Sequence, residues 1–338
     1  MRRFAIAVLL FACSKSNRPG VDETHNQYGG PAARTSGSPG SDAAPPAAAG
    51  CSDGGSARVV KVYVSGESIE ERNRFVVQPL QCSGALVDRG TQNNDNDEYG
   101  WMVPLALRTN FRDPTLALEF VGGGPWTDAE SSPYTGTYPS TTPGRTSAIA
   151  GTDIDSWMNT GSPERGFGPR RDELLLKQYC YDIAFAARGG NDLNQNVTDI
   201  EYKTRLRELV LLLVDGSSCR TDPIVYVTAH MPDRDDVSLQ TQAYYQRTLD
   251  AVTAIKADAG LLQNKRDLVR FVDVFGAFKA NRGTTSMPNP AWYKNGAFDL
   301  TTIGREGDTL HPRRLASIYA GEIVADAFNL TELQVRAK

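Results

Sequence analysis

The chain has 338 residues, of which 22% are charged and 40% hydrophobic, and its formal net charge is -4 at pH 7. These values suit a globular protein with room for one large α/β domain and short appendages. The negative net charge and the lack of a basic stripe with interleaved aromatic residues exclude nucleic acid as an expected partner. No stretch of the sequence is long enough to span a bilayer as a helix.

The first residues have the features of an export signal. Met1-Arg-Arg supplies a positive start, Phe4 to Ala12 a short apolar core, and Leu10-Phe-Ala-Cys13 a cleavage site with small residues. A cysteine at the end of this site resembles the lipobox of bacterial lipoproteins, in which the cysteine carries the lipid and becomes the mature N-terminus. We therefore predict a lipoprotein-type signal over residues 1–13, with Cys13 as the lipidation site. Export without a lipid, with no role for Cys13, is the alternative.

Residues 14–56 are rich in Gly, Pro, Ala, Ser and Asp and contain almost no large apolar side chains. Such a composition cannot bury enough surface to offset the entropy lost on ordering, so we predict a flexible tether. The folded domain is then expected over residues 57–338. A lipid anchor followed by a tether would hold this domain outside the cytoplasm, in the periplasm or at the cell surface, and without the lipid the protein would be secreted.

The chain contains five cysteines, and four remain when Cys13 is assigned to the lipobox. An even number in an exported protein suggests two disulfides, and four cysteines allow three pairings. Cys180 and Cys219 each lie just before a predicted strand, which favours a bond between neighbouring strand starts. Cys51 precedes the first predicted strand, and Cys82 follows the helix that would run back antiparallel to it. We therefore predict the pairs Cys51–Cys82 and Cys180–Cys219.

From Ala57 onward, short apolar runs alternate with amphipathic stretches. The predicted strands cover residues 58–65, 115–121, 181–187, 223–229 and 268–274. Helical or amphipathic segments are predicted at 68–80, 99–107, around 206–213, at 239–259 and at 312–328. Short apolar strands between such segments predict a parallel sheet covered on both faces, with functional groups gathered at the carboxyl ends of the strands.

Ser68 is the candidate nucleophile. The first predicted strand ends at Ser65-Gly66, and a polar helical stretch starts at Ser68. A sharp turn through a glycine would present the serine at the edge of the sheet, over the positive end of a helix, where a developing oxyanion is stabilised. The alternative is a loop serine that only caps the helix.

Three histidines narrow the choice of a catalytic base. His25 lies in the predicted tether. His311 follows Asp308 by three residues, so the carboxylate can orient one ring nitrogen while the other accepts the serine proton. The alternative is a turn aspartate and a surface histidine before a helix-initiating proline. His230 follows the fourth strand and is a reserve base, or a histidine that lines the cleft and contacts substrate.

Three short motifs occur in order at predicted strand ends: Gly66-Glu-Ser68, Gly189-Gly-Asn-Asp192 and Asp308-Thr-Leu-His311. They resemble blocks of the SGNH hydrolases, the GDSL-type lipase and esterase superfamily. The remaining block is a glycine after the second strand, and Ser147–Ser156 with Gly151 matches it best, with Gly122–Gly124 as competitors. The resemblance covers about residues 58–328. It implies a three-layer α/β/α flavodoxin-like sandwich with a central parallel five-stranded sheet.

The resemblance implies a role for each matched residue. Ser68 would be the nucleophile and, through its N–H, one oxyanion donor. Gly151 N–H and the Asn191 side-chain amide would be the other donors, although Asn191 could also belong to a plain turn. His311 would act as general base and then general acid, oriented by Asp308. The departure from the family is Glu67, where an aspartate is usual, and it puts the packing beneath the nucleophile turn in doubt.

The resemblance implies no cofactor. The acidic run Asp233–Asp236 is interpreted as a solvated loop, and nothing in the sequence has the ligand spacing of a zinc site, so no metal is expected.

The predicted function is that of an extracytoplasmic serine esterase. The long stretch 122–171 is rich in glycine, proline and aromatic residues, as binding loops often are, and is interpreted as the wall of a substrate cleft. The predicted substrate-binding residues are Trp126 and Trp157, whose rings could stack on sugars, and His230, which would line the cleft and contact substrate. We therefore favour removal of small acyl groups, above all acetyl, from carbohydrate. A lipase or lysophospholipase-type esterase is the alternative within the same chemistry, and a non-catalytic glycan-binding domain is the alternative outside it.

Overall fold

The computed structural model describes residues 58–71, 75–77, 86–88, 100–125, 145–163, 166–229, 240–258, 263–299 and 314–337. All of these belong to the second of the two units into which the chain divides, Ala47–Lys338. The predicted signal and tether lie outside the described residues, as do Cys13, Cys51, Cys82, Trp126, His230, Asp308 and His311.

The centre of the fold is a sheet of five parallel strands. These are β1 (Arg58–Gly66), β4 (Leu116–Val121), β7 (Ile183–Ala187), β8 (Ile224–Thr228) and β9 (Val269–Val272). Their order across the sheet is β4-β1-β7-β8-β9, which is the flavodoxin-like order. The chain moves outward from β1 to β4 and then crosses back to β7, so the topological switch point lies between β1 and β7. The predicted five-stranded parallel sheet is confirmed.

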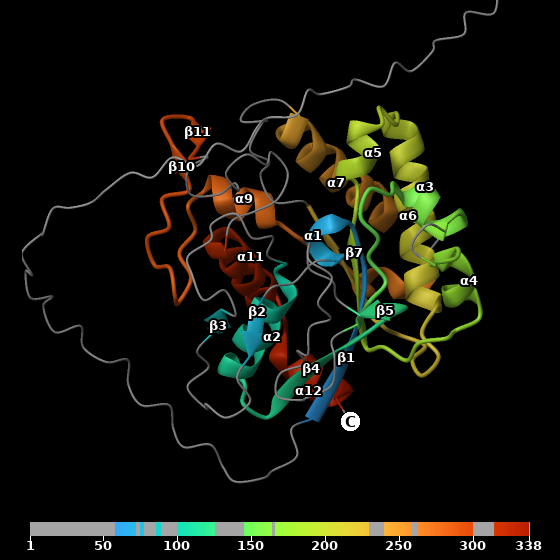
Figure 1. Ribbon diagram of the computed structural model, residues 1–338, viewed down its shortest axis with the longest axis horizontal. Coiled ribbons are helices and arrows are strands. Elements are labelled where there is room, and N and C mark those ends of the chain that lie inside the picture. Colours follow the sequence, from blue (N-terminus) through green and yellow to red (C-terminus); the bar gives the residue numbers. More distant parts are fainter. Residues whose placement is uncertain are drawn as a thin grey trace, which may run out of the picture. The chain divides into compact units, whose positions relative to one another are not determined.

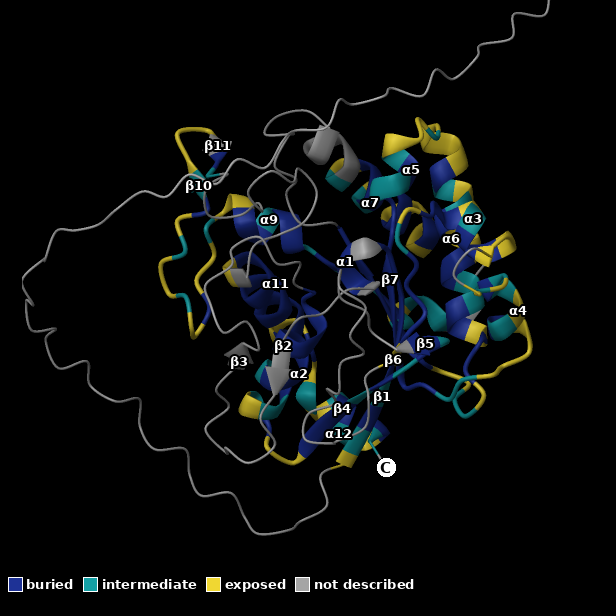
Figure 2. Ribbon diagram, viewed as in Figure 1, coloured by how far each residue is buried: buried dark blue, intermediate teal, exposed yellow. Residues whose placement is uncertain are grey.

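Two apolar cores, one on each face of the sheet, produce the three layers. Along β1, the side chains of Val60, Val62 and Val64 enter one core, whereas that of Tyr63 enters the other. Helices α2 (Met102–Arg112) and α11 (Arg314–Asp326) cover the first face, and α6 (Asp199–Asp215) and α7 (Gln240–Ala257) cover the second (Figure 1). The strands of the central sheet are largely buried, and exposed residues lie on the outer surfaces of the helices and on the connecting loops (Figure 2).

The close packing of α2 against α11 depends on one glycine. A Cβ added at Gly321 of α11 would lie 2.5 Å from the Cβ of Pro104 and 2.6 Å from the carbonyl oxygen of Trp101. Because any side chain at this position would overlap α2, glycine is what lets the two helices approach so closely.

Shorter elements complete the described structure. The helices are α1 (Ser68–Glu71), α3 (Ile154–Asn159), α4 (Arg170–Leu175), α5 (Gly190–Asn194), α9 (Val274–Lys279) and α12 (Leu330–Arg336), and a 3₁₀ helix covers Gln263–Leu268. Three small antiparallel pairs are β2 (Phe75–Val77) with β3 (Leu86–Asp88), β5 (Gly124–Pro125) with β6 (Arg145–Thr146), and β10 (Tyr293–Lys294) with β11 (Ala297–Phe298). Within the described ranges, every helix is too short or too polar to span a bilayer.

The predicted helix over residues 68–80 is wrong in its second half. Helix α1 ends at Glu71, and Phe75–Val77 pairs antiparallel with Leu86–Asp88. The run Phe-Val-Val is aromatic and β-branched, and such residues favour an extended strand over a helix. The predicted Cys51–Cys82 bond assumed the longer helix, but both cysteines lie outside the described residues, so this pairing stays a prediction.

The second predicted disulfide is present. Cys180 and Cys219 are bonded, with their Cα atoms 5.0 Å apart. The two residues precede β7 and β8, which are neighbours in the sheet, so the bond joins the amino ends of adjacent strands as the sequence predicted.

Candidate active site

The turn that presents Ser68 follows β1 at the switch point of the sheet. Gly66 is the last residue of β1 and Ser68 is the first residue of α1. A Cβ on Gly66 would lie 2.4 Å from the Cβ of Glu70, so only glycine allows the helix to follow the strand so closely. The buried carboxylate of Glu70 accepts hydrogen bonds from the N–H of Glu67 at 2.9 Å and from Trp101 Nε1 at 2.8 Å. These bonds fix the geometry of the turn.

The loop that carries Gly151 runs beside the end of β1. The N–H of Ser147 donates to Val64 O and that of Ile149 donates to Gly66 O, both at 3.1 Å. Gly151 then adopts a φ of 74°, in the left-handed region that favours glycine. A Cβ added there would meet no atom within 4 Å, so the loop is open at this point. At the competing Gly122 a Cβ would lie 2.4 Å from the backbone of Thr146, which gives that glycine a packing role.

The third segment follows β7 and is bonded directly to the Gly151 loop. Asn191 in α5 donates from its side-chain Nδ2 to Thr152 O at 3.2 Å. The fully buried Arg188 donates to the same carbonyl from Nη1 at 3.0 Å and to Thr152 Oγ1 from Nη2 at 2.7 Å. Asp192 Oδ2 accepts from Ile154 N at 3.0 Å. Side chains at the end of β7 therefore fix the position of the loop on the far side of β1.

Glu67 connects the nucleophile turn to the same segment. Only 2% of its surface is exposed, and its Oε1 accepts from Gly189 N at 2.8 Å. Its two carboxylate oxygens also lie 3.3 and 3.2 Å from Asn191 N, which donates to them. The glutamate that departs from the family pattern thus accepts hydrogen bonds from the N-terminus of α5, where a negative charge is favoured.

A group of charged residues is buried behind these loops. Arg205 Nη1 lies 2.6 Å from Asp153 Oδ2 and 3.4 Å from Asp192 Oδ1. Burial raises the pKa of Asp192 to about 6, and the negative charge of Glu67 acts in the same direction. Burial also lowers the pKa of Arg188 from its usual range, although the adjacent Glu67 and Asp192 carboxylates oppose this shift.

The described structure therefore brings Ser68, Gly151 and Asn191 to neighbouring segments at the carboxyl ends of β1 and β7. Figure 1 shows α1 beside β7 at this edge of the sheet. Asp308 and His311, with Trp126 and His230, lie outside the described residues, so their predicted roles stay predictions. Among the described residues, no group of three or more His, Cys, Asp or Glu side chains could hold a metal ion.

The prediction that Trp157 binds substrate is wrong. Its side chain is fully buried on the inner face of α3, where Nε1 donates to Ser147 O at 2.6 Å. The Arg188 guanidinium lies 5.0 Å from the ring centroid. Because protein atoms surround the ring, no sugar can stack on it, and its role is to support the loop that leads to Gly151.

The sequence alone indicated no role for Arg188, Thr152 or Asp192. One signal was available: a charged residue, Arg188, directly follows the apolar run of β7, and a charge there needs buried partners or solvent. Nothing local indicated that those partners lie near residue 152.

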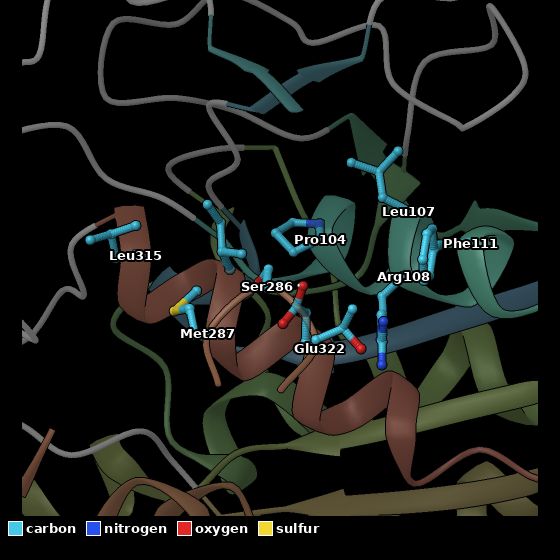
Figure 3. Close-up of a pocket in the computed structure, with 10 residues that line it drawn as sticks. Pro104, Leu107, Arg108, Phe111, Ser286, Met287, Leu315 and Glu322 are labelled. Atoms are coloured by element: carbon cyan, nitrogen blue, oxygen red, sulfur yellow. Dashed lines mark hydrogen bonds between the residues drawn. The ribbon is translucent and has the colours of Figure 1, made fainter. Parts of the chain in front are cut away.

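A separate groove lies between α2 and α11 (Figure 3). Its volume is about 390 Å³. Its walls are formed by Pro104, Leu107, Arg108, Phe111, Thr285, Ser286, Met287, Leu315, Ile318 and Glu322. Phe111 and Leu315 are 64% and 51% exposed. Of the predicted site residues that the structure describes, none lines this groove.

No family model matches the chain, and no curated protein matches it. Among solved structures, a carbohydrate esterase family 3 protein from Talaromyces cellulolyticus is 14% identical, with a TM-score of 0.46 over 82% of this chain and 100% of that chain. The acetylxylan esterase Axe2 from Geobacillus stearothermophilus is 14% identical, with a TM-score of 0.44 over 82% and 97%. Est24, a carbohydrate acetylesterase from Sinorhizobium meliloti, is 13% identical, with a TM-score of 0.40 over 79% and 97%.

Proposed function

We propose that the chain is an extracytoplasmic serine esterase that removes small acyl groups, above all acetyl, from carbohydrate through an acyl-enzyme. The supporting observation is the convergence of three segments at the switch point of the sheet. They are the Gly66–Ser68 turn, the Gly151 loop and the N-terminus of α5 with Asn191, which are joined by hydrogen bonds of 2.8 to 3.3 Å. In flavodoxin-like sheets, this crevice is where ligands bind.

In the proposed mechanism, Ser68 Oγ attacks the ester carbonyl while His311 accepts its proton. The tetrahedral oxyanion accepts hydrogen bonds from the N–H groups of Ser68 and Gly151 and from the Asn191 amide. The Nδ2 of Asn191 carries two hydrogens, so the bond to Thr152 O orients the amide and leaves one N–H for the oxyanion.

His311 then protonates the leaving alcohol, and the acyl group remains on Ser68. A water molecule, deprotonated by His311, releases the carboxylic acid and restores the serine. Asp308 orients the imidazole throughout.

The direct test is hydrolysis of p-nitrophenyl acetate and octanoate by the purified protein, with Ser68→Ala as the control. We expect turnover of acetate that is lost in the variant, and release of acetate from acetylated oligosaccharides. Activity that survives the loss of Ser68 would exclude the mechanism. Absence of turnover on all three substrates, with binding of glycans, would instead identify a non-catalytic binding domain.

A lipase-type esterase is the second candidate, and it requires that the separate groove between α2 and α11 hold the acyl chain of an ester that reacts at Ser68. An apolar groove with exposed Phe111 and Leu315 could accept an acyl chain longer than acetyl. If so, the double variant Phe111→Ser/Leu315→Ser should lose octanoate turnover and keep acetate turnover. Ile200→Ser is the matched control, because Ile200 is 80% exposed on α6, which covers the other face of the sheet.

The extracytoplasmic location is also part of the proposal. The Cys180–Cys219 disulfide is consistent with an oxidising compartment, where such bonds persist. With Cys13 lipidated and residues 14–56 as a tether, the protein should fractionate with membranes and Cys13→Ser should not. If both proteins are found in the soluble fraction, the prediction of a lipid anchor is wrong.

A further inference from the structure

Glu67 makes contacts that its place in the sequence does not suggest. It lies between Gly66 and Ser68 but hydrogen-bonds to two N–H groups more than 120 residues further along the chain. Glu67 is 98% buried, and its backbone N–H donates to the Glu70 carboxylate. A buried carboxylate with these partners forms a rigid connection between α1 and α5.

We propose that Glu67 is a positioning residue that fixes Asn191 relative to the nucleophile turn before substrate binds. This inference rests on the proposed function, because it concerns the distance between the attacking serine and one oxyanion donor. Asn191 is held at two points. Its backbone N–H donates to Glu67, and its side-chain Nδ2 donates to Thr152 O at 3.2 Å. A donor held in this way needs no reorganisation when the oxyanion forms.

The connection continues away from α5. Trp101 Nε1 donates to one oxygen of Glu70, whose other oxygen accepts from Glu67 N. The nucleophile turn is thus bonded on one side to the start of α2 and on the other to α5. An aspartate at position 67 is shorter by one methylene, about 1.5 Å. It could not keep the 2.8 Å contact with Gly189 N unless the backbone moved. Aspartate is therefore not a conservative replacement here.

Kinetics of Glu67 variants distinguish the proposed positioning role from a role in fold stability alone. The positioning role has the following consequences. Glu67→Gln preserves the shape but removes the charge and directs an amide toward N–H donors. Through misplacement of Asn191, kcat for p-nitrophenyl acetate should fall about 10- to 100-fold, with KM little changed. The fall should be absent when Asn191 is already alanine, so Glu67→Gln/Asn191→Ala should match Asn191→Ala alone. If Glu67 only stabilises the fold, Glu67→Gln should lower the melting temperature and leave kcat unchanged. If Glu67 affects kcat independently of Asn191, the effects of the two substitutions on kcat should multiply instead.

Asp182→Asn is the matched control. Asp182 is also a buried carboxylate, and its Oδ2 accepts from the backbone N–H of Lys61 at 2.9 Å. It lies just before β7, at the opposite edge of the sheet from Ser68. Its loss should lower the melting temperature and leave kcat unchanged.

Hydrogen exchange tests the same connection without any turnover. In Glu67→Gln, the amides of Gly189 and Asn191 should exchange at least about tenfold faster than in the wild type, and in Asp182→Asn they should not. If the wild-type protein is inactive but the two amides exchange faster in Glu67→Gln, the esterase proposal is rejected, whereas the hydrogen-bonded connection between Glu67 and α5 is supported. Active wild type with multiplicative kcat effects, or unchanged exchange at both amides, would overturn the role of Glu67.

Discussion

Asp192 should make the protein less stable as the pH rises from 4 to 7. Its side chain is fully buried, with Arg205 Nη1 3.4 Å from Oδ1 and Ile154 N 3.0 Å from Oδ2. Burial is the main reason that its pKa is raised from 3.8 to about 6. The charges that face it include Glu67 and Asp153, which raise its pKa further, Arg188, which lowers it, and the ion-paired Arg205. The perturbation we choose is Asp192→Asn, which is neutral at every pH and can still accept the bond from Ile154.

The sign follows from proton linkage. Because the pKa of Asp192 is higher in the folded state, that state binds more protons between about pH 4 and 6, and the free energy of unfolding falls as the pH rises. This contribution is complete below the unfolded pKa and is lost as the pH rises through about 6. A shift of about two units corresponds to about 3 kcal/mol at 1.36 kcal/mol per unit. Because the unfolded carboxyl, with its pKa of 3.8, is already partly ionised at pH 4, the variant should gain about 2 kcal/mol relative to the wild type between pH 4 and pH 7.

Urea unfolding of both proteins at pH 4, 5, 6 and 7 measures this difference. Burial also raises the pKa of Glu173, but this residue is present in both proteins, so its effect cancels in the comparison. Burial raises the pKa of Asp153, but hydrogen bonds from Ser156 and Arg205 outweigh it and lower this pKa, and Asp153 too is present in both proteins. Parallel stability curves for the two proteins would show that Asp192 is ionised throughout, and would refute the reasoning.

Three further predictions concern the site, the helix packing and the disulfide. Asn191→Ala should lower kcat for p-nitrophenyl acetate about 10²- to 10³-fold with little change in KM. If this variant keeps full turnover, Asn191 is not an oxyanion donor. Gly321→Ala should lower the free energy of unfolding by about 1–3 kcal/mol, because its Cβ would overlap α2. At Gly168, where a Cβ meets nothing within 4 Å, alanine should change stability by less than about 0.5 kcal/mol, and equal effects at both glycines would contradict the packing argument. Cys180→Ser/Cys219→Ser removes a bond between residues 39 apart and should cost about 4 kcal/mol in urea unfolding, so an unchanged midpoint would show that the bond does not form.

The sequence by itself determined the sheet and the order of the segments that meet at its edge. Apolar runs and glycine-marked ends are local signals, and parallel strands place every such end at the same edge. The same logic predicted the bond between Cys180 and Cys219, because both precede strands that proved to be neighbours. The sequence alone therefore leads us to expect that the motifs at Gly66, Gly151 and Asn191 converge.

Only the tertiary structure decided what surrounds these motifs. Trp157 resembled a cleft aromatic in a glycine-rich stretch, yet its ring lies beneath Arg188. Phe75–Val77 followed a helical start but formed a strand, because a partner was present at Leu86–Asp88. The sequence shows that Glu67 stands where the SGNH pattern usually has aspartate, but only the structure shows that its hydrogen-bond partners are the N–H groups of Gly189 and Asn191. Burial and hydrogen-bond partners depend on residues distant in the chain, so no local pattern could supply them.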